Sequence, residues 1–113
     1  MKILITGGNG QIGSHLIELL LRENCKILNI DNLKTGRKVH LKTNKNLENY
    51  FFSISHSKKV EEVFNKFKPE VVVHCAASYK DPDDWDSDIM TNCVGTVNLL
   101  KNSQKTNVKK FIY

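Results

Sequence analysis

Short apolar runs alternate along the chain with longer segments whose apolar residues recur at helical spacing. Lys2–Thr6 and Lys26–Ile30 are runs of the short kind, and each ends at a turn sequence, Gly-Gly or Asp-Asn. Such runs are typical of strands that are buried on both faces of a sheet. Residues 11–23 lie between them and have the length of a helix. The apolar residues expected on one face of this helix are Ile12, Leu16, Leu19 and Leu20.

The same alternation continues through the middle of the chain. A Gly- and Lys-rich loop is expected over residues 33–49, followed by a strand over Tyr50–Ile54. Ser57 is a suitable N-cap for the next helix, and Pro69 is expected to end that helix. The apolar face of this second helix comprises Val60, Val63, Phe64 and Phe67.

The last third of the chain predicts two more strands, over residues 71–76 and 108–113, with an acidic loop (81–88) and a helix between them. The apolar residues of this helix are Ile89, Cys93, Val97, Leu99 and Leu100. Strands that alternate with helices indicate an α/β fold, in which helices cover both faces of a parallel sheet. Because crossovers are right-handed, we expect a doubly wound sheet with strand order 3-2-1-4-5.

Composition limits the class of protein. The chain has 113 residues, of which 40% are hydrophobic and 26% are charged. This is ordinary for one globular domain over residues 1–113 and excludes disordered and collagen-like classes. No apolar run approaches the roughly 20 residues that a membrane-spanning helix needs, and the N-terminus does not resemble a secretory signal. We therefore expect a cytoplasmic protein with no membrane partner.

Positive charge is concentrated in the middle of the chain. The formal net charge is +5, and residues 34–68 contain nine basic and three acidic residues. Together with the aromatic residues Tyr50, Phe51 and Phe52, this segment could form a nucleic-acid face, whose binding would depend steeply on salt. The lysines also fit the solvated side of a helix, which is the stronger interpretation, so we expect no nucleic-acid partner.

The three cysteines are Cys25, Cys75 and Cys93. Their odd number and long spacing predict reduced thiols rather than a disulfide framework. Only His74 and Cys75 are neighbours, and adjacent residues of a strand point to opposite faces. We therefore expect no metal site.

Three glycines follow the first predicted strand and open the first predicted helix. Gly7, Gly10 and Gly13 are spaced Gly-x-x-Gly-x-x-Gly. The first glycine permits a tight turn, the second lets the backbone approach a pyrophosphate, and the third lets helix and strand pack closely. The helix N-terminus offers N–H groups and a positive dipole end to the phosphates. The alternative is a merely structural turn, but the position between strand and helix favours dinucleotide binding.

An acidic residue ends the second predicted strand. Asp31 lies 18 residues after Gly13, where a carboxylate can accept hydrogen bonds from the ribose hydroxyls of an adenosine and repel a 2′-phosphate. This favours NAD over NADP. Two alternatives stay open: Arg37 and Lys38 could reach a phosphate, and Asp31-Asn32 could be an ordinary turn pair.

With these residues, the chain resembles the extended short-chain dehydrogenase/reductase family. Within that family it is most similar to the NAD-dependent nucleotide-sugar epimerases and dehydratases of the UDP-glucose 4-epimerase type. The segments that carry the resemblance are Thr6–Gly13 (TGGNGQIG), Asp31–Gly36 (DNLKTG), His74–Ala77 (HCAA) and Asn92–Leu100 (NCVGTVNLL). They follow one another in family order across nearly the whole chain.

The resemblance implies a Rossmann-like doubly wound sheet, truncated at about its fifth strand, and NAD as the cofactor. The implied pyrophosphate loop comprises Gly7, Gly10, Gln11, Ile12 and Gly13. The other implied cofactor residues are Asp31, Asn32 and Gly36 around the adenine-side ribose, Ser53 and Ile54 at the adenine, Ala76, Ala77 and Ser78 on the nicotinamide side, and Asn92, which would steady the active-site helix. The family places a loop over cofactor and substrate at residues 79–85, and assigns His74 a structural role.

The sequence departs from the family in two respects. Ser53-Ile54 stands where these enzymes commonly have Asp followed by an aliphatic residue, so the contact to the adenine amine should be weaker. The family's catalytic Ser/Thr and Tyr-x-x-x-Lys would begin beyond Tyr113. Tyr79-Lys80 cannot replace them, because Tyr and Lys must lie one helical turn apart. We therefore expect no catalytic residue in this chain.

Two functions remain open. The chain is either the NAD-binding part of a nucleotide-sugar epimerase or dehydratase, which acts by transient hydride transfer to NAD and is inactive alone, or a non-catalytic dinucleotide-binding module or partner-assisted sensor. In the first case a nucleotide sugar binds only when the remaining part is supplied. The family's dimer helices would include residues 86–106, so a homodimer is compatible with either function.

Overall fold

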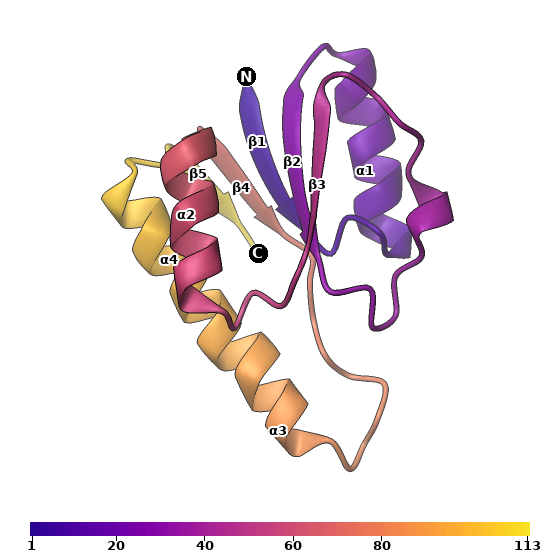
Figure 1. Cartoon of the computed structure of the whole chain (residues 1–113), viewed down its shortest axis with the longest axis vertical. Helices are drawn as coiled ribbons and strands as arrows, with labels where there is room; N and C mark the ends of the chain where they lie inside the picture. Colours follow the sequence, from indigo (N-terminus) through magenta and orange to yellow (C-terminus); the bar gives the residue numbers. More distant parts are fainter.

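Five parallel strands form one sheet in the order β3-β2-β1-β4-β5 (Figure 1), in a computed structural model that describes residues 1–113. The strands are β1 (Lys2–Thr6), β2 (Lys26–Asp31), β3 (Leu47–Phe51), β4 (Val71–His74) and β5 (Lys110–Ile112). The α/β class, the doubly wound sheet and the strand order predicted from the sequence are confirmed. The change of direction on either side of β1 puts the switch point between β1 and β4, where open α/β sheets bind ligands.

Helices cover both faces of this sheet, α1 on one face and α2 with α4 on the other (Figure 1). The helical segments are α1 (Gln11–Arg22), the 3₁₀ turn η1 (Lys38–His40), α2 (Ser57–Phe67), α3 (Trp85–Asp88), the π-helix η2 (Ile89–Gly95) and α4 (Thr96–Lys105). The last three run on from one another as a single long helical stretch, the lower part of which extends beyond the sheet (Figure 1).

The core has two layers because neighbouring strand residues point to opposite faces. Leu4 and Leu28 pack against α2 and α4, where Phe64 is fully buried. Ile5 packs on the other face against Ile17 of α1. The second predicted apolar face is confirmed in full, since all four of its residues are buried.

The face predicted for α1 is only partly right: Leu16 and Leu20 are partly buried against the core, but Ile12 and Leu19 are not on the buried face. Ile17 is fully buried, whereas Ile12 and Leu19 are 76% and 58% exposed. Gly13 and Ser14 are the other buried residues of this helix. The glycine side of α1 must turn toward the strand that precedes it, and this rotates part of the expected apolar face away from the sheet.

Other boundaries differ from prediction. β3 begins at Leu47, three residues before the expected start, and residues 52–54 have already left the sheet. Ser57 is the first residue of α2 rather than its N-cap, which is His56. The expected apolar face of the helix before β5 is also only partly right: Leu99 is buried, but Val97 and Leu100 are nearly half exposed.

No helix combines the length and apolar character required to cross a membrane. No group of three or more His, Cys, Asp and Glu side chains lies close enough to hold a metal ion. All three cysteines are free thiols.

Candidate cofactor site

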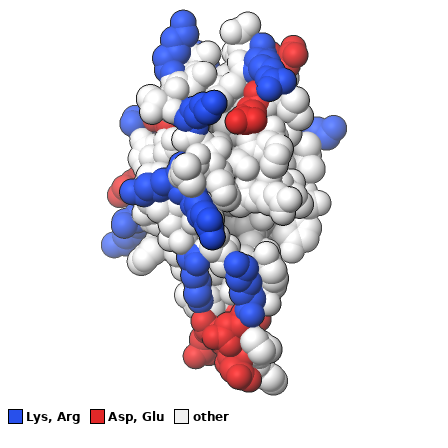
Figure 2. Space-filling view, turned by 90° about the vertical axis from the view of Figure 1, so that its right-hand side faces the viewer, with Lys and Arg blue, Asp and Glu red and all other residues white.

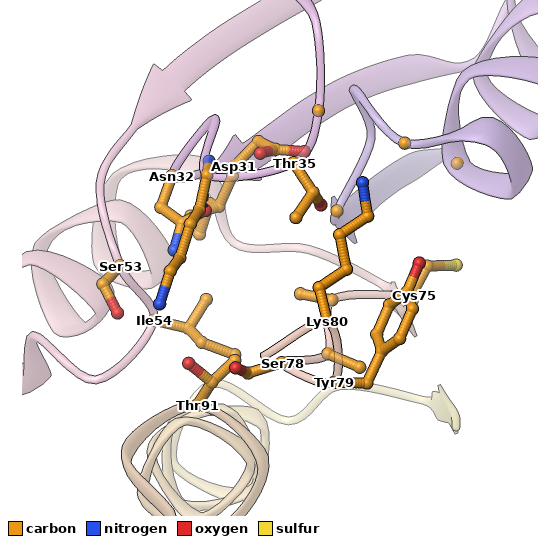
Figure 3. Close-up of a pocket in the computed structure, with 18 of the residues that line it drawn as sticks. Asp31, Asn32, Thr35, Ser53, Ile54, Cys75, Ser78, Tyr79, Lys80 and Thr91 are labelled. Atoms are coloured by element: carbon orange, nitrogen blue, oxygen red, sulfur yellow. Dashed lines mark hydrogen bonds between the residues drawn. The ribbon is translucent and has the colours of Figure 1, made fainter. Parts of the chain in front are cut away.

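A cleft with a volume of about 300 Å³ lies at the carboxyl ends of β1, β2, β3 and β4. All the site residues predicted from the sequence line this cleft, except Asn92. Figure 3 shows Asp31, Asn32 and Thr35 on one wall and Ser78, Tyr79 and Lys80 on the other. The cleft therefore lies where a doubly wound sheet binds a nucleotide.

The glycine loop forms the floor of the cleft, and its glycines differ in whether the fold has room for a side chain at their position. Gly7 has φ +71°, and a Cβ there would lie 2.8 Å from the backbone N of Ala76. A Cβ at Gly13 would overlap the carbonyl oxygen of Gly7. At Gly10 the added atom would meet only that same oxygen, at 3.2 Å. Gly7 and Gly13 are thus required by the fold, whereas the absence of a side chain at Gly10 mainly leaves space in the cleft.

The N-terminus of α1 faces this space. Gly10 is the N-cap and provides no side-chain hydrogen bond to the first turn. Gln11, Ile12 and Gly13 line the cleft, and first-turn N–H groups have no partner inside a helix. Uncapped N–H groups beside a glycine suit an anionic group such as a pyrophosphate.

Asp31 makes the turn contact that the sequence offered as one alternative, and it also lines the cleft. Its carboxylate oxygens accept backbone N–H groups of Leu33 at 2.8 Å and of Asn9 at 2.9 Å. The first contact is the local turn expected from Asp-Asn, and the second ties β2 to the glycine loop. Asp31 also lines the cleft, and each carboxylate oxygen can accept more than one hydrogen bond.

The opposite wall is held from behind by Asn92. The Ser78 N–H donates to Asn92 Oδ1, and Asn92 Nδ2 donates to the Ser78 carbonyl, both at 2.8 Å. Asn92 lies in the π-helix and supports the wall without lining the cleft, where its neighbour Thr91 lies instead (Figure 3). The structure therefore places Asn92 as a support of residues 76–78.

His74 links the floor of the cleft to the same helix. Its Nδ1 lies 2.6 Å from Thr6 Oγ1, and its Nε2 lies 2.9 Å from Thr96 Oγ1. Thr6 Oγ1 also accepts the Ala76 N–H, while Thr96 Oγ1 donates to the Asn92 carbonyl. Thr6 can then donate to Nδ1 and Thr96 can accept from Nε2–H, which is the arrangement of a neutral imidazole. Burial lowers the pKa of His74 to about 4, in agreement with this neutral form.

An ion pair connects the two walls. Lys34 Nζ lies 2.8 Å from Asp84 Oδ2 and 2.9 Å from Ser87 Oγ. The hydrogen bond between them raises the pKa of Lys34 and lowers that of Asp84. Ser87 in turn contacts Ser78 Oγ at 3.3 Å. The loop after β2 is thereby joined to the segment after β4 that carries Ser78, Asp84 and Ser87.

The charges around the cleft are unevenly distributed. Figure 2 shows acidic atoms gathered at one end of the molecule, directly beside basic side chains. This end carries α3 and the loop before it, a segment with five aspartates between residues 81 and 88.

Cys75 also lines the cleft, but burial raises the pKa of its thiol, which makes it a poor nucleophile.

The polar groups that support this site from below were not predicted from the sequence. Asn29 is fully buried in β2, where its Oδ1 accepts the Gly8 N–H at 2.9 Å. Asn9 is fully buried beside it and bonds to Asn29, Asp31 and Arg37. The only signal was an asparagine inside an otherwise apolar strand. Lys34 and Thr35 were also missed as residues that line the cleft.

Comparison with known proteins agrees with this geometry. The model of the NAD dependent epimerase/dehydratase family matches residues 3–113. The chain belongs to this family. The chain spans only part of the length of its relatives. For one curated relative, the probable dTDP-glucose 4,6-dehydratase of Sinorhizobium fredii, the matched part is 32% of that protein.

Two solved structures and one curated protein illustrate the family likeness. The Bordetella bronchiseptica enzyme WbmH in complex with NAD+ is 49% identical with a TM-score of 0.97, over 99% of this chain and 38% of that chain. WbmG from the same organism, in complex with NAD and UDP, is 45% identical with a TM-score of 0.95, over 96% of this chain and 35% of that chain. The UDP-glucose 4-epimerase of Mycolicibacterium smegmatis is 31% identical, over 100% of this chain and 38% of that protein.

Proposed function

We propose that the chain binds NAD(H) in the cleft and is the cofactor-binding part of a nucleotide-sugar epimerase or dehydratase. The observation that carries this proposal is the glycine floor at the uncapped N-terminus of α1, with Asp31 at the end of β2. The pyrophosphate would lie over Gly10, where an added Cβ would contact only one atom of the fold, the Gly7 carbonyl oxygen at 3.2 Å. The NAD-dependence of the family and the NAD complexes of WbmH and WbmG support the same ligand.

The bound cofactor supplies the chemistry of accepting a hydride and returning it. The residues of this chain would bind and orient it. The α1 N–H groups and the loop at Gly10 would hold the phosphates, and Asp31 would accept the ribose hydroxyls. The wall formed by residues 76–78 would border the nicotinamide side, supported by the paired hydrogen bonds from Asn92.

Titration calorimetry with NAD(H) and NADP(H) tests this proposal. We expect NAD(H) to bind more tightly than NADP(H), because a 2′-phosphate would approach the Asp31 carboxylate. Absence of NAD(H) binding by the folded chain would refute the proposal. Tighter binding of NADP(H) would refute the assignment of Asp31.

We also propose that residues 1–113 contain no acid–base set for sugar chemistry. Both nitrogens of His74 are engaged with threonine hydroxyls, and Tyr79 and Lys80 are adjacent residues on an exposed loop. Sugar chemistry needs a base within hydrogen-bond reach of a sugar hydroxyl. The chain with NAD and a UDP- or dTDP-sugar should show no exchange of the C4 or C5 proton by NMR. Exchange above the enzyme-free control would reveal a base in this chain.

A homodimer through the outer face of α3, η2 and α4 is a further proposal. Ile89, Met90, Val97 and Leu100 on this stretch are each 45–55% exposed. Apolar side chains grouped on one helical face are typical of interaction surfaces. Sedimentation of the wild type and of Leu100→Glu tests this, and a monomeric wild type would refute it.

A further inference from the structure

Asn9 takes part in five hydrogen bonds, two through its side chain and three through its backbone, although it does not line the cleft. Its backbone N–H donates to Asp31, and its Nδ2 donates to the Arg37 carbonyl at 3.1 Å. Its carbonyl accepts the Arg37 N–H at 3.1 Å and a bond from His40 Nδ1 at 2.8 Å. A single fully buried residue of the glycine loop therefore holds the segment after β2 at two points, at Arg37 and at His40 of η1.

Backbone groups fix the orientation of the Asn9 amide. The Gly8 N–H can only donate, so Asn29 presents its Oδ1 there and its Nδ2 to Asn9 Oδ1, at 2.8 Å. Asn9 then presents its Nδ2 to the Arg37 carbonyl, which can only accept. This chain of hydrogen bonds runs in one direction, from the glycine loop to Arg37. Replacing Asn9 by an apolar residue would leave the buried Asn29 amide and the Arg37 carbonyl without these partners.

Arg37 is thus clamped through its backbone at both N–H and C=O. Gly36 lies directly against Asn9, because a Cβ at Gly36 would be only 2.8 Å from the Asn9 Cβ. Lys34, Thr35 and Gly36 line the cleft, whereas the next residue, Arg37, does not. The Asn9 clamp acts at the point where the segment leaves the cleft wall.

This segment carries three cations that could attract a 2′-phosphate: Lys34, Arg37 and Lys38. Lys34 is paired with Asp84, and Lys38 Nζ lies over the Phe51 ring at 4.7 Å from its centroid. Arg37 is the cation whose position depends on the Asn9 clamp. Binding of a 2′-phosphate next to the Asp31 carboxylate would require a compensating cation.

We propose that Asn9 is a specificity-determining positioning residue: by clamping the Arg37 backbone, it keeps the Arg37 guanidinium out of the ribose end of the cleft, and the site therefore discriminates against NADP. The proposal rests on the proposed function, since it assumes that a dinucleotide binds in this cleft. It assigns a role to a buried side chain that would not touch the ligand.

The test is the ratio of the NADP and NAD dissociation constants, measured by titration calorimetry on the 113-residue chain. In Asn9→Ala, the Arg37 carbonyl loses its side-chain partner, although the Arg37 N–H can still donate to the backbone carbonyl of residue 9. The loosened Arg37 can then reach the 2′-phosphate, and we expect the ratio to fall by about threefold to tenfold, as for one hydrogen bond of ordinary strength. Adding Arg37→Ala to this variant should restore the wild-type ratio. Asn65→Ala removes an exposed asparagine of α2 and is the matched control, with an unchanged ratio.

A second variant perturbs the same contact from the other side. Gly36→Ala introduces the Cβ that Asn9 excludes, so it displaces the segment without removing any hydrogen-bonding side chain, and the ratio should again fall. It decides the question if Asn9→Ala does not fold. A ratio that stays at the wild-type value in the folded variants while NAD still binds would overturn the role of Asn9. A wild type that binds no NAD would instead refute the proposed function.

Discussion

Acidification from about pH 7.5 to about pH 5.5 is expected to destabilise the fold through His74. The imidazole is 6% exposed and makes hydrogen bonds with Thr6 and Thr96, an arrangement that requires the neutral ring. Burial lowers its pKa from 6.5 to about 4. In the unfolded chain the ring takes up a proton near pH 6.5, whereas in the native chain it does so only near pH 4.

The sign and size of the effect follow from these two values. Between them the unfolded state binds more protons, so the free energy of unfolding falls as the pH falls, and the fall levels off below about pH 4. One pKa unit corresponds to about 1.4 kcal/mol, and the loss between pH 7.5 and 5.5 is therefore at most about 1.4 kcal/mol. To an order of magnitude, the expected loss is therefore about 1 kcal/mol.

Urea unfolding followed by circular dichroism at the two pH values measures this loss. His74→Gln removes the titrating ring, so this variant should lose about 1 kcal/mol less than the wild type over the same interval, whatever its own stability at neutral pH. His15→Gln changes an exposed histidine of α1 and should behave as the wild type. An equal loss in His74→Gln and the wild type would show that the pH dependence comes from other groups.

Three further predictions concern the site and its supports. Asp31→Ala should weaken NAD binding by roughly 1–3 kcal/mol, and it should also lower the melting temperature because the same carboxylate accepts two backbone N–H groups. Wild-type NAD affinity in calorimetry would contradict this prediction. Lys34→Ala should speed the release of NAD in stopped-flow fluorescence with little change in melting temperature, because it removes the ion pair with Asp84 and leaves the core unchanged. An unchanged release rate would show that this ion pair does not retain NAD in the cleft. Asn29→Ala should cost about 2 kcal/mol in thermal unfolding by leaving the buried Gly8 N–H without its partner, and a stability equal to that of Asn65→Ala would contradict this account.

The features predicted well from the sequence are those set by local pattern. β1 and β2 are continuous apolar runs that end at turn residues, and their bounds agree with the structure to within one residue. The glycine spacing located the floor of the cleft because backbone geometry at Gly7 and Gly13 leaves no room for a side chain. Asp31 was found because the end of β2 must lie beside that floor in a parallel sheet.

The features that the sequence did not predict depend on tertiary contacts. β3 is an edge strand with three exposed residues, so its apolar pattern is too weak to fix its start. The amide network of Asn9 and Asn29 joins residues that are 20 positions apart. Asn9 lies within the glycine motif, but at a position that the glycine spacing leaves unspecified, and Asn29 belongs to no motif. The helical stretch before β5 carries apolar residues that the sheet does not cover, such as Val97 and Leu100, and these misled the assignment of its buried face.

The central claim is that the cleft over the glycine loop binds NAD, and one substitution tests it most directly. Gly10→Val places a side chain where the pyrophosphate of the cofactor would lie. Within the fold, the new Cβ would approach only one atom, the Gly7 carbonyl oxygen at 3.2 Å. Titration calorimetry of wild type and Gly10→Val with NAD, with circular dichroism to verify folding, makes the comparison. The account predicts NAD binding by the wild type and none by a folded Gly10→Val chain. Equal NAD binding by both proteins would contradict it and leave the glycine loop a purely structural turn.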